Sequence, residues 1–148
     1  MIYLKSDEEI VLLRSSNLIV AKTLAELAKI IAPGVTTLTL NKRAEEFIRD
    51  NGGVPNFLGY GGFPGSICTS VNDQIVHGIP SDNVILKEGD IISIDCGVLK
   101  DGFNVDFSGV YGSPIAKIIA IVVVASHAFF CQSKAYKQIT DLVGRWKY

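Results

Sequence analysis

The sequence has little of what identifies several classes of protein. Its three cysteines, Cys68, Cys96 and Cys131, show no CxxC spacing, so neither a disulfide framework nor a zinc ribbon is indicated. Its net charge of −1 is too small for a polybasic nucleic-acid-binding protein or for a highly charged disordered chain. The longest apolar run, between about positions 118 and 131, contains His127 and is too short to cross a bilayer.

A secretory signal is also lacking, because the opening MIYLKSDEE has acids where such a signal carries apolar residues. The length of 148 residues, 48% of them hydrophobic, suffices for one domain with a real core but not for two of full size. We therefore expect a cytoplasmic protein with no membrane partner and no nucleic-acid specificity.

Acidic residues almost disappear from the last quarter of the chain. Residues 1–112 have a charge balance of −5, whereas residues 113–148 have a balance of +4 and contain one acid, Asp141. This break predicts two parts, a folded domain over 1–112 and a divergent tail over 113–148.

Helical signals fill the first third of the sequence. Ser6 and Glu9 form a capping box, which predicts a helix start, and apolar residues continue at helical spacing until Pro33-Gly34 ends the helix. A second helix is predicted between about positions 36 and 51, where Thr36 or Thr37 could cap it. Together these segments predict a helical hairpin.

Strand signals follow a glycine-rich segment over 59–65, which is predicted to be an irregular loop. The strands are expected at 66–71, 91–98 and 103–111. Asp101-Gly102 between the last two favours a two-residue type I′ hairpin turn. The predicted fold class is α+β, with the helical hairpin packed on an antiparallel sheet.

Asp95 and Asp106 are the main candidates for chemistry. If Asp101 and Gly102 form the turn, Asp95 lies opposite Ser108 and Asp106 opposite Gly97, so both aspartates share one face as diagonal neighbours. Two such carboxylates can share a proton, or they can bind divalent cations, which prefer oxygen ligands. They can also be solvated separately on an open sheet face, and the spacing alone does not decide.

The other polar candidates have ordinary alternatives. A single histidine such as His77, between Val76 and Gly78, is more often structural than catalytic. Cys68 and Cys96 lie in apolar strands, where small core residues are the usual interpretation.

Three consecutive segments resemble motifs of type I methionine aminopeptidases: SVNDQIVHGIP (70–80), LKEGDIISIDCG (86–97) and DGFNVDFSGVYG (101–112). The opening helix, the APGVTTLTLN segment (32–41) and the glycine-rich loop are similar too. The resemblance covers residues 1–112 and implies the N-terminal half of the pita-bread fold, here truncated.

The resemblance also implies an activity, the removal of initiator methionine from nascent proteins, at a centre of two divalent ions (Co, Mn, Fe or Zn). Asp95 and Asp106 match metal ligands, and His77 matches the catalytic histidine that contacts the substrate and helps to stabilise the transition state. Asn72 and Gln74 match positions that hold a structural monovalent cation. The pocket for the methionine side chain would be lined by Phe57, Tyr60, Phe63, Cys68 and His77. The implied partners are N-terminal methionyl peptides, and contact with the ribosome is left open.

The remaining metal ligands of that family, a histidine in a Gly-His-Gly setting and two glutamates, have no match in residues 113–148, which contain no glutamate. Three explanations follow. The tail could be read out of frame from about Ser113, leaving a chain that is inactive alone. The chain could be a non-catalytic module that binds N-terminal peptides or a protein partner. Another chain, or a second copy, could complete the site.

Overall fold

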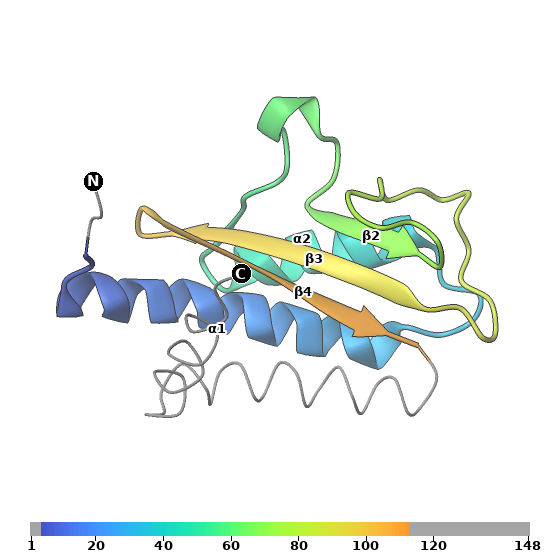
Figure 1. Ribbon diagram of the computed structural model, residues 1–148, viewed down its shortest axis with the longest axis horizontal. Coiled ribbons are helices and arrows are strands. Elements are labelled where there is room, and N and C mark those ends of the chain that lie inside the picture. The colour runs from blue at the N-terminus through green and yellow to red at the C-terminus, as the bar shows by residue number, and fades with distance from the viewer. Residues whose placement is uncertain (1–3, 113–148) are drawn as a thin grey trace, which may run out of the picture.

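The computed structural model describes residues 4–112, and its helices pack on an antiparallel sheet as the sequence predicts (Figure 1). The predictions for the tail, including His127, Cys131 and Asp141, lie outside the described residues. The elements in chain order are α1 (Asp7–Ile30), α2 (Thr37–Asp50), β1 (Val54–Pro55), the 3₁₀ turn η1 (Tyr60–Gly62), β2 (Ile67–Val71), β3 (Ile92–Lys100) and β4 (Phe103–Tyr111).

Both helices begin at the caps that the sequence predicts. Ser6 Oγ accepts a hydrogen bond from Glu9 N at 3.3 Å, and the Glu9 carboxylate accepts one from Ser6 N at 2.9 Å, which completes the capping box. At α2, Thr36 Oγ1 accepts from Thr39 N at 3.1 Å. These side chains satisfy backbone donors that have no partner inside the helix.

β3 is the central strand of the sheet. It pairs antiparallel with β4 along its whole length, and on its other side with β2 over 92–96 and β1 over 98–99. The residue pairing confirms the predicted register, since Asp95 lies opposite Ser108 and Asp106 opposite Gly97. Asp101 and Gly102 have φ values of 50° and 81°, the positive values that a type I′ turn requires.

The helices cover one face of the sheet. Alternate residues of β3 point toward them and are buried, as are Leu24 and Leu27 of α1 and Leu40 and Ile48 of α2. Ser16 of α1 donates a hydrogen bond to the carbonyl of Phe103 at 3.1 Å and so fastens the helix to the β3–β4 hairpin. The other residues of β3, Asp95 among them, lie on the face that the helices leave open.

The glycine-rich loop rises from the sheet on the side away from α1 (Figure 1). It differs slightly from its prediction, because the three residues of η1 form a 3₁₀ turn within it. Gly59, Gly61 and Gly62 all have positive φ, which keeps regular structure to that single turn.

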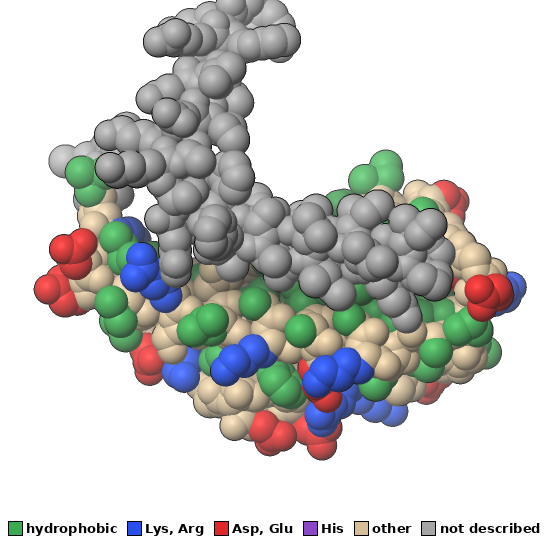
Figure 2. Space-filling model, turned by 90° about the horizontal axis from the view of Figure 1, so that it is seen from below, with side chains coloured by type: hydrophobic (Ala, Val, Ile, Leu, Met, Phe, Trp, Pro, Cys, Tyr) green, Lys and Arg blue, Asp and Glu red, His purple; other side chains and the backbone are tan. Residues whose placement is uncertain are grey.

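Figure 2 shows the side of the molecule that lies lowest in Figure 1, where basic and acidic side chains are interspersed with apolar ones. Arg43 of α2 forms an ion pair with Glu26 of α1 at 2.9 Å and thereby links the two helices. Among the described residues, no helix has both the length and the apolar character needed to span a membrane.

Candidate active site

Asp95 and Asp106 come from adjacent strands and lie on the open face of the sheet. Asp95 is half-buried, whereas Asp106 is exposed. Burial raises the pKa of Asp95, and the negative charge of Asp106 raises it further, so the two carboxylates interact. A hydrogen bond from Ser108, one from the backbone of Cys96, and the nearby His77 oppose this rise. The pair therefore concentrates negative charge at a partly desolvated position.

His77 lies in the connection between β2 and β3, near enough to Asp95 for its electrostatic effect to lower the pKa of that carboxyl. Its side chain is exposed, and its backbone has a φ of 59°, in the left-handed region that histidine seldom adopts. The next residue, Gly78, is hydrogen-bonded to β2: its carbonyl accepts from Thr69 N at 2.8 Å. The backbone at His77 is thus held by the hydrogen bonds of its neighbour to β2 rather than by burial of the His77 side chain.

Phe57 and Cys68 provide apolar surface beside the carboxylates. Phe57 lies against Gly97, two residues beyond Asp95 and directly opposite Asp106. Cys68 of β2 pairs with Asp95 across the strands. Burial raises the pKa of the Cys68 thiol to about 11, and the charge of Asp95 contributes to this shift.

Two other predicted pocket residues are less closely connected to this place. Tyr60 belongs to η1 and keeps 81% of its surface exposed. Phe63 follows η1 and is half-buried, and its N–H donates to the carbonyl of Tyr60 at 3.0 Å. Cys96, which was predicted to be a core residue, does face the core. Burial there raises the pKa of its thiol to about 12.

Asn72 and Gln74, the predicted monovalent-cation residues, use their side chains to fold the connection after β2. Asn72 Nδ2 donates to Asp90 at 2.9 Å, and its Oδ1 accepts from Ile91 N at 3.1 Å. Gln74 Oε1 accepts from Val71 N at 3.2 Å. A cation at this point stays a prediction about their backbone carbonyls.

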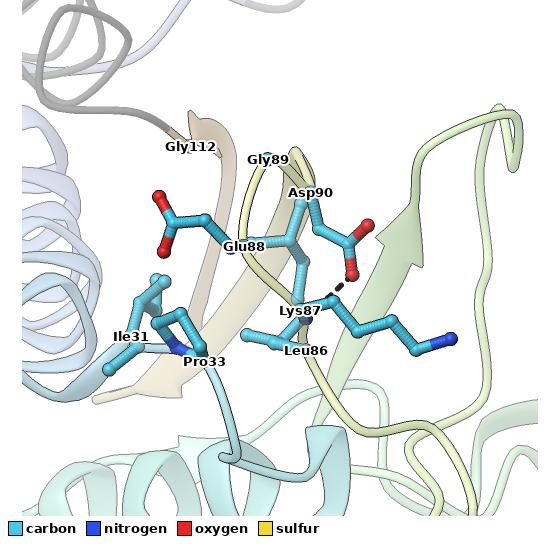
Figure 3. A pocket seen from close by; sticks show the side chains of 10 residues that line it. Ile31, Pro33, Leu86, Lys87, Glu88, Gly89, Asp90 and Gly112 are labelled. Atoms are coloured by element: carbon cyan, nitrogen blue, oxygen red, sulfur yellow. Dashed lines mark hydrogen bonds between the residues drawn. The ribbon is translucent and has the colours of Figure 1, made fainter.

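A separate cavity of about 230 Å³ lies at the end of the sheet where β3 begins and β4 ends (Figure 3). Its lining includes Ile31, Pro33, Glu88 and Gly112. Asp90, also in the lining, accepts a hydrogen bond from Lys87 N at 2.8 Å, shown as the dashed line in Figure 3. None of the predicted site residues lines this cavity.

The carboxylate pair suits a hard divalent cation but does not complete a site for one. Within residues 4–112, no group of three or more His, Cys, Asp and Glu side chains is placed to hold a metal ion. Catalytic metal centres generally have three or more protein ligands. Two carboxylates on one face are therefore what the described residues could contribute to such a site.

Sequence reasoning predicted the carboxylates but missed how their surroundings are held. Ser108 could be placed opposite Asp95 from the register, although its hydrogen bond to the carboxylate was not foreseen. The contact of Phe57 with Gly97 and the anchoring of Gly78 on β2 have no local signal in the sequence.

Comparison with known proteins gives consistent matches. The model of "Metallopeptidase family M24" matches residues 11–142. A methionine aminopeptidase of Clostridium acetobutylicum is 44% identical over 132 residues, which are 88% of this chain and 53% of the relative. Methionine aminopeptidase 1 of Bacillus subtilis is 48% identical over 118 residues, which are 80% of this chain and 46% of the relative.

Solved structures agree with these relatives. The crystal structure of methionine aminopeptidase from Rickettsia prowazekii aligns with a TM-score of 0.74 at 39% identity, covering 76% of this chain and 45% of that one. The prediction of a truncated pita-bread fold is therefore confirmed. The chain spans about half the length of the relatives that it matches.

Proposed function

Because this chain belongs to metallopeptidase family M24, we propose that its open sheet face is one half of an aminopeptidase site that removes N-terminal methionine from peptides. The observation that carries the proposal is that Asp95 and Asp106 share one face of the sheet beside the apolar Phe57 and Cys68. His77 is near enough to lower the pKa of Asp95. A metal ligand pair next to an apolar wall fits a substrate that has an amino terminus and an unbranched thioether side chain.

Asp95 and Asp106 are the residues that would hold divalent ions. Their oxygen donors suit Mn²⁺ and Co²⁺. Burial and then repulsion from Asp106 raise the pKa of Asp95, and a cation that neutralises the pair would relieve this repulsion. When bound, such ions polarise a scissile carbonyl and lower the pKa of a water molecule. His77 would contact the peptide next to the scissile bond, and Phe57 and Cys68 would exclude water around the side chain.

The described residues alone do not provide a complete set of ligands, so we expect weak metal binding and little turnover from this chain by itself. Completion by a second polypeptide would restore activity that rises with protein concentration. An out-of-frame origin of residues 113–148 and contact with the ribosome stay predictions that bear on the whole protein.

The test combines a binding measurement with an assay. Mn²⁺ is titrated into the full chain and followed by electron paramagnetic resonance, and release of methionine from a Met-Gly-containing peptide is measured with Mn²⁺ or Co²⁺ added. We expect binding that Asp106→Asn abolishes, while Asp101→Asn, an exposed carboxylate at the turn, leaves it unchanged. Equal Mn²⁺ binding by wild type and Asp106→Asn contradicts the proposed metal site.

A second candidate function is capture of methionyl peptides without hydrolysis. It is favoured by the presence of the apolar wall, Phe57 and Cys68, next to a ligand set that residues 4–112 leave incomplete. Peptide binding that is weakened by Phe57→Ala, together with no released methionine at micromolar protein, would support this function over catalysis.

A further inference from the structure

We propose that Ser70 positions His77: its hydroxyl holds the backbone of Gly78 against β2 and so keeps the imidazole beside Asp95. This inference rests on the proposed function only in assigning His77 a contact with substrate. The placement of His77 by Ser70 is a property of the chain itself and can be tested without metal or peptide.

The anchoring contact is buried and well defined. Gly78 N donates to Ser70 Oγ at 3.1 Å, and Ser70 exposes only 4% of its surface. Thr69 N donates in turn to the carbonyl of Gly78 at 2.8 Å. Two hydrogen bonds therefore fix the peptide groups of the residue directly after His77, and a buried N–H that lost its acceptor would be costly.

Gly78 approaches β2 too closely for any other residue. A Cβ at this position would lie 2.0 Å from the carbonyl oxygen of Thr69. This close approach fixes the path of the chain at His77, whose own φ of 59° is a strained value for a non-glycine residue. Since the His77 side chain is exposed, the position of its Cβ is determined by the backbone contacts of Gly78.

Ser70 is also on the correct face of the sheet. Cys68 pairs with Asp95 and Ser70 pairs with Ser93, so residues 68, 70, 93 and 95 all share the open face. The Ser70 hydroxyl therefore anchors the β2–β3 connection from the face of the sheet that also carries Asp95.

The chain offers a matched control in Ser66, which is just before the same strand. Ser66 is fully buried, and its hydroxyl donates to Glu45 of α2 at 2.9 Å instead of to the His77 connection. Loss of the Ser70 hydroxyl removes a buried hydrogen bond, and loss of the Ser66 hydroxyl removes a part-buried one. Only loss of Ser70 should move His77.

The experiment is a double-mutant cycle read by NMR on the metal-free full chain. The Cε1–Hε1 signal of His77 is identified with His127→Gln, because the chain has two histidines. In the wild-type background, Asp95→Asn should shift this signal, and the absence of any shift would overturn the placement of His77 beside Asp95. We expect Ser70→Ala to reduce that shift by at least half and to accelerate exchange of the Gly78 amide by about tenfold, as for loss of one ordinary hydrogen bond.

The controls separate positioning from stability. Ser66→Ala should leave both readouts as in wild type, and Ser70→Thr should restore them. Valine has the shape of threonine without the hydroxyl. If Ser70→Ala does not fold, the comparison of Ser70→Thr with Ser70→Val therefore shows whether the hydroxyl positions His77. The proposal is overturned if the His77 signal responds to Asp95→Asn as fully in Ser70→Ala or Ser70→Val as in wild type. It is also overturned if Ser66→Ala reduces this response and the protection of the Gly78 amide as much as Ser70→Ala does.

Failure of the proposed function gives a different result. If wild-type protein binds no Mn²⁺ while the NMR cycle behaves as expected, the metal site is wrong and the positioning by Ser70 stands. If Mn²⁺ binds at Asp106 but Ser70→Ala leaves His77 in place, the metal site stands and the positioning of His77 by Ser70 is wrong.

Discussion

The aromatic ring of Phe57 lies against the backbone of Gly97, so closely that a Cβ on Gly97 would be 2.6 Å from Cε1 of the ring. Asn56 N, the preceding amide, donates to the carbonyl of Gly97 at 2.9 Å and fixes this approach. Because Gly97 has no side chain, the Phe57 ring can lie on β3 and form the apolar wall beside Asp95 and Asp106.

The first prediction concerns this contact. Gly97→Ala should lower the free energy of unfolding by about 1–3 kcal/mol, because the added methyl group must displace the ring. Urea denaturation measures the loss. In a Phe57→Ala background the same substitution should cost much less, and additive effects of the two changes would show that ring and glycine do not touch.

The second prediction follows from the environment of Asp95. Its pKa is raised above the unfolded value, chiefly by burial and then by Asp106, so the folded state favours the protonated form. Between the ordinary carboxyl pKa and the raised one the native state binds more protons, and this group's contribution to stability falls as pH rises. Asp95→Asn should therefore stabilise the metal-free protein at pH 7, and the advantage should shrink as the pH is lowered through the carboxyl range.

Paired urea melts of wild type and Asp95→Asn at several pH values measure this difference. The matched variant Asp101→Asn, at the exposed turn, should show no such advantage. A destabilised Asp95→Asn at pH 7 would mean that hydrogen bonds to the carboxylate outweigh its burial.

The parts of the fold that the sequence predicted are those with local causes. Ser6 and Glu9 are three residues apart, and Asp101-Gly102 sets the whole β3–β4 register through its own backbone conformation. The carboxylate pair followed from that register. The two contacts that complete the surroundings, Phe57 with Gly97 and Ser70 with Gly78, depend on how irregular connections return to the sheet. Periodic patterns in the sequence do not predict the path of such connections.

The third prediction tests how α2 fixes the start of β2. Asn41 Oδ1 accepts hydrogen bonds from Ser66 N at 2.7 Å and Ile67 N at 3.2 Å, and Asn41 is buried. Asn41→Ala should reduce the free energy of unfolding by about 2–3 kcal/mol because two buried N–H groups lose their acceptor. The exposed neighbour Lys42→Ala is the control, with an expected change within about 0.5 kcal/mol.

The fourth prediction uses the Cys68 thiol as a reporter of the carboxylate face. The thiolate is the form that alkylating agents attack, and the pKa of Cys68 is about 11 because of burial and the charge of Asp95. In a Cys131→Ser background, the alkylation rate of Cys68 should keep rising with pH up to about that value. Mass spectrometry of the labelled peptide distinguishes Cys68 from Cys96.

Removing the negative charge should change this profile in a defined direction. Asp95→Asn lowers the pKa of Cys68, so alkylation at a fixed pH near 9 becomes faster, whereas Asp82→Asn, an exposed control, leaves it unchanged. A divalent cation held by Asp95 and Asp106 would compensate the same charge, and Mn²⁺ should therefore shift the wild-type profile the same way but have little effect on Asp95→Asn. An identical Mn²⁺ effect in both proteins would place the cation elsewhere, because only an ion at the carboxylates acts on Cys68 through Asp95.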